Sequence, residues 1–360
     1  MPSRQPTLNV VVLTHTTATD FLDATEHILQ EHSLTSNIIY PFAIKARSSE
    51  RLPVSNARGP TYWSAPRQAP TKTPRQFWLT QWTSRGATTA APPTLDFVVA
   101  VNDNQFGGYP VFFWSPHPSA DMTNAFLSVR IQAMITHLLR AAPAERVFSV
   151  FGQDPVVEAF TSMWTQYTGK IPEQEVFYAA KFSFCTTKTL LPAPALAPGH
   201  ALRLATPADL EQCAQLCKEF ADDSVYFGLS LSDARIQAQS MIGAKQLWVY
   251  DTPQGIATIV ASTRRTTDAV ASINKVYTPP AHRGKGCARA LVAHVTNALL
   301  SGADGSSKHY AVVLYVGHDN SAARVYHRVG YQGLSEDAPR PREVENWLEI
   351  GFQGTNRGHW

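Results

Sequence analysis

A strand, a glycine-rich turn and a helix follow one another without interruption between residues 269 and 302. The segment 269–277, AVASINKVY, is rich in β-branched and aromatic side chains, which is typical of a β-strand. Apolar residues recur at helical spacing over 288–299, and Gly302 stands where that helix would end. This order predicts an α/β structure in which a strand leads directly into the first turn of a helix.

The turn between the two elements, HRGKG at 282–286, has the properties of an anion-binding site. The first turn of a helix leaves backbone N–H groups unpaired and carries a partial positive charge. Gly284 and Gly286 keep side chains away, so those amides can approach a phosphate closely. Arg283 and Lys285 add positive charge beside them. The turn therefore predicts a phosphate or pyrophosphate ligand.

Two common phosphate-binding motifs do not fit this turn. A P-loop needs a Ser or Thr directly after its Lys, but Gly286 follows Lys285. A dinucleotide fingerprint needs a third glycine, and Arg289 stands at that position. The pattern that fits is R-x-x-G-x-A, formed by Arg283, Gly286 and Ala288.

This pattern resembles the acetyl-CoA pyrophosphate loop of the GNAT acetyltransferase superfamily. One branch of the superfamily, which includes proteins built of two such parts, has V-Y-T-P-P-x-x-R-G-x-G, and the same wording begins here at Val276. A second family signature follows the expected strand 310–316: Asn320, Tyr326 and the pair Gly330-Tyr331, with the Asn-to-Tyr stretch one residue shorter than usual. The two signatures together are specific, whereas an isolated R-G-K-G turn could be only a tight turn.

The resemblance implies a function for individual residues. The residues implied to hold acetyl-CoA as co-substrate are Val276, Tyr277, Thr278, Arg283, Gly284, Lys285, Gly286, Cys287, Ala288, Asn320 and Tyr326. Tyr326 would be the acid near the leaving thiolate, although taken alone it would more often be a packed aromatic. Asn320 would bind the pantetheine arm or fix a water, and backbone groups of Val276 and Thr278 would bind the thioester and that arm. Tyr326 and Asn320 are thus the candidate catalytic residues.

The acceptor side of the site is less defined by the sequence. The strand before the loop carries no carboxylate: Asn274, Lys275 and Tyr277 stand where the family often has Glu, so the base is a water chain or a carboxylate of the substrate. The candidate acceptor-binding residues are Asp222, Asp223, Tyr226 and Phe227. The two acids either attract a cationic amine or are solvated loop residues. The two aromatic residues either line the acceptor pocket or only pack in the protein interior.

Composition sets limits on partners and location. The 360 residues are 44% hydrophobic and 16% charged with a net charge of +3, which fits a globular protein without a nucleic-acid-binding run of basic residues. The sequence contains no apolar stretch of membrane-spanning length. The four cysteines form neither a disulfide framework nor a zinc pattern, so we expect no metal site and a cytoplasmic location. Cys287 is expected to be a small packing residue.

The chain divides into two expected domains. Residues 1–188 are expected to form a degenerate GNAT-like domain that ends with a strand at 175–185, because residues 115–120, SPHPSA, lack glycine where a CoA loop should stand. A Pro/Ala linker at 189–200 leads to a catalytic domain at 201–360, which ends with a strand at 346–352. A Pro-rich loop occupies 51–74.

The expected fold is therefore a tandem GNAT-like α/β (α+β) architecture with a mixed central sheet flanked by helices and a complete GNAT domain in the second half. The leading hypothesis is an N-acetyltransferase that transfers acetyl from acetyl-CoA directly to a primary amine of a small molecule, in a monomer or dimer. The alternatives are a protein or peptide acetyltransferase, or a CoA-binding regulatory domain without turnover.

Overall fold

The computed structural model describes residues 8–50, 76–85, 92–104, 107–223, 228–265, 269–303, 305, 308–337 and 339–358. The chain forms two compact units. Unit 1 comprises Met1–Tyr178 and Trp347–Trp360, and unit 2 comprises Ala179–Asn346. The predicted Pro-rich loop at 51–74 lies outside the described residues.

The sheet of unit 1 has the strand order β1-β2-β3-β6-β7-β14. These strands are β1 (Leu8–His15), β2 (Phe77–Arg85), β3 (Thr94–Val101), β6 (Val111–Trp114), β7 (Ser149–Gln153) and β14 (Asn346–Gly351). β6 and β7 run parallel, and the other neighbours run antiparallel. A two-stranded ribbon, β4 (Asp103–Asn104) with β5 (Gly107–Gly108), stands apart from the sheet.

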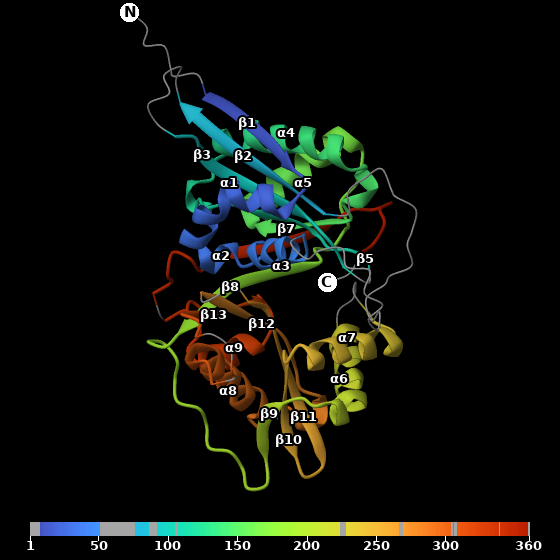
Figure 1. Ribbon diagram of the computed structural model, residues 1–360, viewed down its shortest axis with the longest axis vertical. Coiled ribbons are helices and arrows are strands. Elements are labelled where there is room, and N and C mark those ends of the chain that lie inside the picture. The colour runs from blue at the N-terminus through green and yellow to red at the C-terminus, as the bar shows by residue number, and fades with distance from the viewer. Residues whose placement is uncertain are drawn as a thin grey trace, which may run out of the picture. The chain divides into compact units, whose positions relative to one another are not determined.

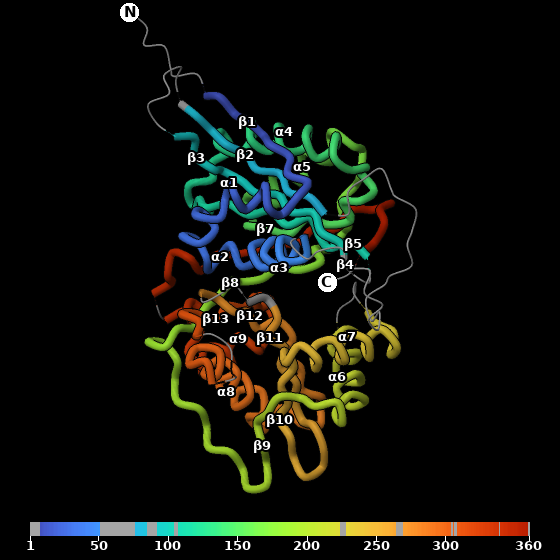
Figure 2. Tube along the Cα trace, viewed as in Figure 1, coloured from blue at the N-terminus to red at the C-terminus, as the bar shows by residue number. Residues whose placement is uncertain are grey.

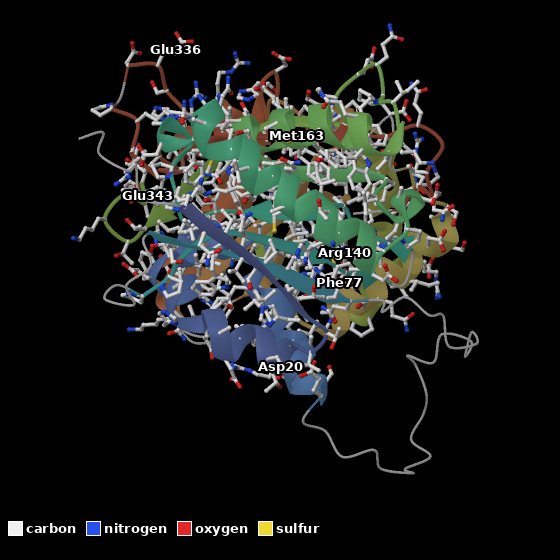
Figure 3. All side chains as sticks on the ribbon, turned by 90° about the horizontal axis from the view of Figure 1, so that it is seen from above. Asp20, Phe77, Arg140, Met163, Glu336 and Glu343 are labelled. Carbon is white, nitrogen blue, oxygen red and sulfur yellow. The ribbon has the colours of Figure 1, made fainter. Side chains whose placement is uncertain are left out.

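Helices cover both faces of this sheet (Figure 1). They are α1 (Ala18–Glu31), α2 (Ser33–Ser36), α3 (Tyr40–Glu50), α4 (Asn124–Ala141) and α5 (Asp154–Thr168), with single 3-10 turns at Ser119–Asp121 and Ala144–Arg146. Phe77 faces the core under α4 and α5, whereas its neighbour Trp78 stacks on Phe21 of α1 at 5.1 Å between ring centroids. Successive strand residues point to opposite faces. Asp20 of α1 and Met163 of α5 accordingly lie on opposite sides of the strands (Figure 3).

The sheet of unit 2 has the strand order β8-β13-β12-β11-β10-β9. These strands are β8 (Tyr178–Thr186), β9 (Ala201–Leu204), β10 (Leu247–Thr252), β11 (Gly255–Arg265), β12 (Val270–Tyr277) and β13 (Ala311–Gly317). β12 and β13 run parallel, and the other neighbours run antiparallel. The expected strand–turn–helix order is confirmed, because β12 leads through the turn into α8 (Cys287–Ser301).

One face of the unit 2 sheet packs on α8 and the short helix α9 (Ala322–His327), and the other packs on α6 (Leu210–Asp222) and α7 (Leu231–Gly243). Single 3-10 turns lie at Pro207–Asp209 and Pro280–His282. Successive residues of β10 face opposite sides of the sheet. Trp248 packs in the core beneath α8, here called the α8 core, and Val249 packs in the core beneath α6, the α6 core. Gly302 ends α8 in the left-handed conformation at φ 73°, as its sequence position predicts.

The two units share one topology. Each sheet has a run of antiparallel strands, then a parallel pair, β6–β7 or β12–β13, then one antiparallel strand at the end. In each unit the helix that follows the first strand of the parallel pair, α4 or α8, packs on the sheet. This arrangement confirms the predicted mixed α/β fold with helices on both faces of the sheet.

The end strand of each unit comes from a distant part of the chain. β8 pairs with β13 in unit 2 along Ala311–Gly317, although its residues directly follow unit 1 in sequence. β14 pairs with β7 in unit 1, although it follows unit 2 in sequence. In Figure 2 the yellow-green β8 lies beside the orange β13. The division therefore differs from the boundaries 1–188 and 201–360 that the sequence predicts, because strand pairing and not the Pro/Ala segment sets the units.

Trp347 and Phe352 are buried in the core of unit 1, at 0% and 2% exposure. Within the described ranges, no helix has both the length and the apolar character that crossing a bilayer requires.

The strand exchange predicts how fragments behave. A fragment of residues 179–346 keeps β8 as partner of β13, whereas a fragment of residues 201–360 leaves that edge of β13 without it. We expect cooperative thermal unfolding for the fragment 179–346 and a lower midpoint, or none, for 201–360, because unpaired strand edges and exposed apolar surface are costly. Circular dichroism melts of the two fragments test this. Equal midpoints would contradict it.

Candidate functional site

The turn before α8 has a defined backbone conformation. A 3-10 turn at Pro280–His282 brings the chain to Arg283, which is extended. Gly284 and Gly286 then take positive φ values of 76° and 81°. Residues that carry a side chain rarely adopt such positive φ values, so glycine is required at both positions. A Cβ atom built on either glycine would meet nothing within 4 Å, so the space beside the turn is open.

The backbone amides at the start of α8 face this open space without intrahelical partners. Gly286 is the N-cap and supplies no side-chain cap. The first bond of the helix runs from the Ala290 N–H to the Gly286 carbonyl at 3.0 Å, so the N–H groups of Cys287, Ala288 and Arg289 precede the intrahelical pattern. With Arg283 and Lys285 exposed beside them, these donors suit an anionic ligand.

The equivalent helix of unit 1 begins differently. Thr123 caps α4, because its hydroxyl accepts a hydrogen bond from the Phe126 N–H at 3.3 Å. The preceding segment 115–120 contains two prolines, which supply no N–H donors. One chain thus presents two helix N-termini at the same topological position, one capped by its own side chain and one open.

A buried polar cluster further fixes the unit 1 segment. The Asp96 carboxylate lies 2.8 Å from Nε of Arg130 and 3.0 Å from Nε2 of His117, and also contacts the Thr83 hydroxyl. Burial opposes its ionisation, yet hydrogen bonds from His117, Thr83 and Arg130 lower the pKa of Asp96 on balance. Ser115 anchors the same segment by donating to the Asp96 carbonyl at 2.7 Å. These contacts hold the segment before α4 within unit 1.

The parallel strands β12 and β13 separate just before the turn. They pair only over Val270–Ser272 and Ala311–Val313. Beyond these residues each strand pairs on its outer side alone, β12 with β11 and β13 with β8. The second half of β12, including Val276, therefore presents an unpaired edge toward β13. Figure 1 shows α8 and α9 beside these strands.

The predicted catalytic residues lie beside β13. Tyr326 of α9 is buried at 7% exposure, and its ring lies 5.9 Å from that of Tyr331. Asn320 is exposed, and its side-chain oxygen accepts a hydrogen bond from the Ala322 N–H at 2.9 Å. Asn320 thus stabilises the start of α9, a local role that the sequence did not predict.

The residues of β12 and the turn divide between the two faces of the sheet. Val276 and Cys287 pack in the α8 core, and Tyr277 packs in the α6 core. The Thr278 carbonyl accepts a hydrogen bond from Nε of Arg283 at 2.9 Å. Only the backbone of Tyr277, and not its ring, can therefore line the open edge of β12.

The predicted acceptor-side acids lie at the end of α6. Asp222 pairs with Lys218 on the helix surface, whereas Asp223 lies 3.6 Å from Nη2 of Arg283. The structure therefore brings Asp223, but not Asp222, to the turn. Tyr226 and Phe227 lie outside the described residues.

Glu219 and Phe220 on α6 are two residues of this region that the sequence did not single out. The Glu219 carboxylate lies beside the Tyr277 hydroxyl, and burial together with that carboxylate raises the pKa of Tyr277. The Phe220 ring lies 6.5 Å from the Tyr277 ring and 4.2 Å from Nζ of Lys275. The carboxylate missing from β12 is thus present on the neighbouring helix. The only sequence signal for this carboxylate is that Glu219 and Phe220 lie close to the candidate residue Asp223.

The thiol of Cys287 is a packing group in this structure. It is 5% exposed and lies beside the Tyr250 hydroxyl, which is 2.9 Å from Nδ1 of His200. Burial raises the pKa of Cys287, despite its place in the first turn of α8. Within the described ranges, His, Cys, Asp and Glu side chains do not gather into a metal-binding group.

Comparison with known proteins identifies the domain that contains this turn. Residues 243–333 match the model of the acetyltransferase (GNAT) domain family. This segment is a GNAT acetyltransferase domain. It covers β10 to α9, the two strand edges and the open N-terminus of α8, and it makes the chain an acyltransferase.

One solved structure shares the fold over nearly the whole chain, and two others are similar to it at lower TM-scores. A Drosophila protein aligns with a TM-score of 0.57 at 11% identity, covering 96% of this chain and 98% of its own. A GCN5-related N-acetyltransferase of Sphaerobacter thermophilus aligns at 0.48 and 14% identity, covering 94% of each chain. A tandem GNAT protein from the clavulanic acid biosynthesis pathway aligns at 0.45 and 13%, covering 98% of this chain and 100% of its own. A comparison with curated protein sequences found no match.

The burial of the cysteines predicts slow thiol chemistry. All four cysteines are free and buried, and burial raises the pKa of Cys185, Cys213, Cys217 and Cys287. We expect little reaction with an aromatic disulfide reagent in the native protein at neutral pH, because the thiolate is the reactive form. Absorbance of the released thiol measures this, and the denatured protein serves as control. Rapid modification of Cys287 in the native protein would contradict it.

Proposed function

We propose that this protein transfers an acetyl group from acetyl-CoA to a primary amine of a small molecule by direct attack in a ternary complex. The observation that carries this proposal is the open N-terminus of α8 beside the unpaired edge of β12, within a GNAT acetyltransferase domain. The first feature suits a pyrophosphate, and the second suits an extended amide-containing chain.

The turn fits the pyrophosphate of acetyl-CoA, which would supply the acetyl group as a thioester. The N–H groups of Cys287, Ala288 and Arg289 would donate to phosphate oxygens. Arg283 and Lys285 are exposed and have room to approach the same oxygens. Arg283 at present contacts Asp223 across 3.6 Å between side chains that are 54% and 64% exposed, an ion pair too weak to hold it away from a phosphate.

The unpaired edge of β12 fits the thioester and the pantetheine arm. Main-chain groups of Val276 would pair with the amides of that arm as a neighbouring strand would. A main-chain N–H at this edge can also stabilise the oxyanion that develops during acyl transfer. Pro279 and Pro280 supply no N–H, so the chain leaves the strand there without disturbing this edge.

The proton transfers need an acid and a base. The Tyr326 hydroxyl on α9 would donate a proton to the leaving thiolate, and Asn320 would position the arm or a water. The acidic end of α6, with Glu219 and Asp223, favours a cationic amine acceptor. A carboxylate at Glu219 also supplies a candidate proton acceptor beside β12, where the strand itself has none.

Ligand-dependent stability tests acetyl-CoA binding. A ligand that binds only the folded state stabilises it by about 2.7 kcal/mol at a hundred times its dissociation constant, so saturating acetyl-CoA should raise the melting temperature. We expect Arg283→Ala to reduce this shift and Gly286→Glu to abolish it, because Glu places a carboxylate among the phosphate donors. Differential scanning fluorimetry measures the shift.

Matched controls exist for both variants. Arg235→Ala removes an exposed arginine on α7, and Gly305→Glu changes a glycine with φ 80° whose Cβ would also meet nothing within 4 Å. Both controls should keep the full shift. No shift in the unchanged protein at saturating acetyl-CoA would overturn the proposal.

Removal of one hydroxyl tests the acid. Tyr326→Phe keeps the ring in the α8 core and should lower kcat by about 10²-fold, since a positioned proton donor contributes about 10²–10⁴-fold. Free CoA thiol, measured with a panel of primary amines, reports the rate. Tyr331→Phe, which loses only the 3.0 Å contact with the Thr296 hydroxyl, is the control and should lower stability more than rate. An unchanged kcat in Tyr326→Phe would assign Tyr326 to packing alone.

A further inference from the structure

Lys275 is a buried lysine in the half of β12 that has separated from β13. Its side chain is 8% exposed and lies on the α6 face of the sheet, and its register partner on β11 is the apolar Ala261. Its Nζ lies 4.2 Å from the centroid of the Phe220 ring. Lysine is rarely buried unless it is paired, so this position calls for an explanation.

The amine has no acidic partner in the described part of the chain. The α6 side chain that interacts electrostatically with the amine is Cys217, a fully buried thiol whose pKa burial raises, so that thiol stays neutral. Glu219 lies beside the hydroxyl of Tyr277, and Asp223 is nearest to Arg283. Burial therefore lowers the pKa of Lys275, and the neighbouring Cys217 only partly opposes this.

A lysine of this kind is a nucleophile. The neutral amine has a free electron pair. At a pH below the pKa, each unit by which the pKa falls raises the fraction of neutral amine about tenfold. Its four-carbon stem is flexible, and no ion pair within the described residues restrains it. The contact with the Phe220 ring is the interaction that holds its end.

Lys275 also stands at the acceptor side of the site. It directly precedes Val276, and consecutive Cα atoms are about 3.8 Å apart. The end of α6 packs here through the contact of Phe220 with Tyr277 and the approach of Asp223 to Arg283. The buried amine and the strand edge assigned to the thioester therefore belong to one small region of unit 2.

We propose that the side-chain amine of Lys275 is itself an acetyl acceptor, so that the domain acetylates its own β12 strand. This rests on the proposed function, because the acetyl donor is the acetyl-CoA bound at α8. The Nζ–acyl bond forms and the thioester carbon–sulfur bond breaks. The sulfur leaves with the electron pair and takes up one amine proton, so the products are N-acetyl-lysine and CoA thiol.

The modification changes the acceptor side of the site. An amide is not protonated at neutral pH, so acetylation leaves an uncharged group beside the Phe220 ring and lengthens the side chain. An amide does not return its acetyl group to an amine as a thioester does, so the product is stable. The longer side chain occupies acceptor space, and the protein limits its own turnover when free amine is scarce.

The test needs only the full-length protein and acetyl-CoA. Intact-mass spectrometry, followed by peptide sequencing, should find one acetyl group per chain, located on Lys275. The rate should not depend on protein concentration, because the reaction is intramolecular. The acetylation rate should rise with pH and reach its plateau at a pH below about 10.4, the usual lysine pKa. Lys275→Arg should abolish the modification, and Lys188→Arg, which changes an exposed lysine of unit 2, should not.

Two results would overturn the proposal while leaving the proposed function intact. One is an unmodified Lys275 in protein whose melting temperature shows that acetyl-CoA binds. The other is equal acetylation of Lys275 in Gly286→Glu, which would mark it as reaction with free acetyl-CoA. Absence of any thermal shift would overturn the proposed function and this inference together. Localisation in the unchanged protein keeps the test decisive even if Lys275→Arg folds poorly.

Discussion

Backbone hydrogen-bonding groups that the fold leaves without partners are the constraint on which the rest of this structure depends. A helix cannot pair its first N–H groups internally, and a strand edge that leaves its neighbour cannot pair there. Unit 2 places both sets next to each other, where β12 departs from β13 and enters α8. The glycines keep the space open, and the core on both faces holds the unpaired groups in position.

Unit 1 shows what the same topology becomes when those groups are satisfied internally. Thr123 caps α4, and the Asp96 cluster with Arg130 and His117 binds the preceding segment. The Thr123 hydroxyl takes up one N–H of the first turn of α4, and the Asp96 cluster keeps its polar groups bonded within unit 1. The contrast lies in a few side chains, because the strand order and the parallel pair are common to both units.

The sequence predicted the strand–turn–helix unit of the candidate site and missed contacts that only the tertiary structure creates. The turn from Arg283 to Gly286 could be predicted, because glycine, proline and helix-start preferences act over a few residues. The place of Glu219 beside Tyr277 could not be predicted. Glu219 and Tyr277 are far apart in sequence, and only the packing of α6 on β12 brings them together.

The sequence by itself determined the strand–turn–helix unit, the α/β class and the end of α8, where Gly302 acts locally. Only the tertiary structure decided which strand completes which sheet. The patterns of β8 and β14 fit either sheet, because backbone pairing is the same for any strand of alternating character. It also decided that Lys275 is buried with no acidic partner among the described residues, since burial depends on neighbours that arrive from α6.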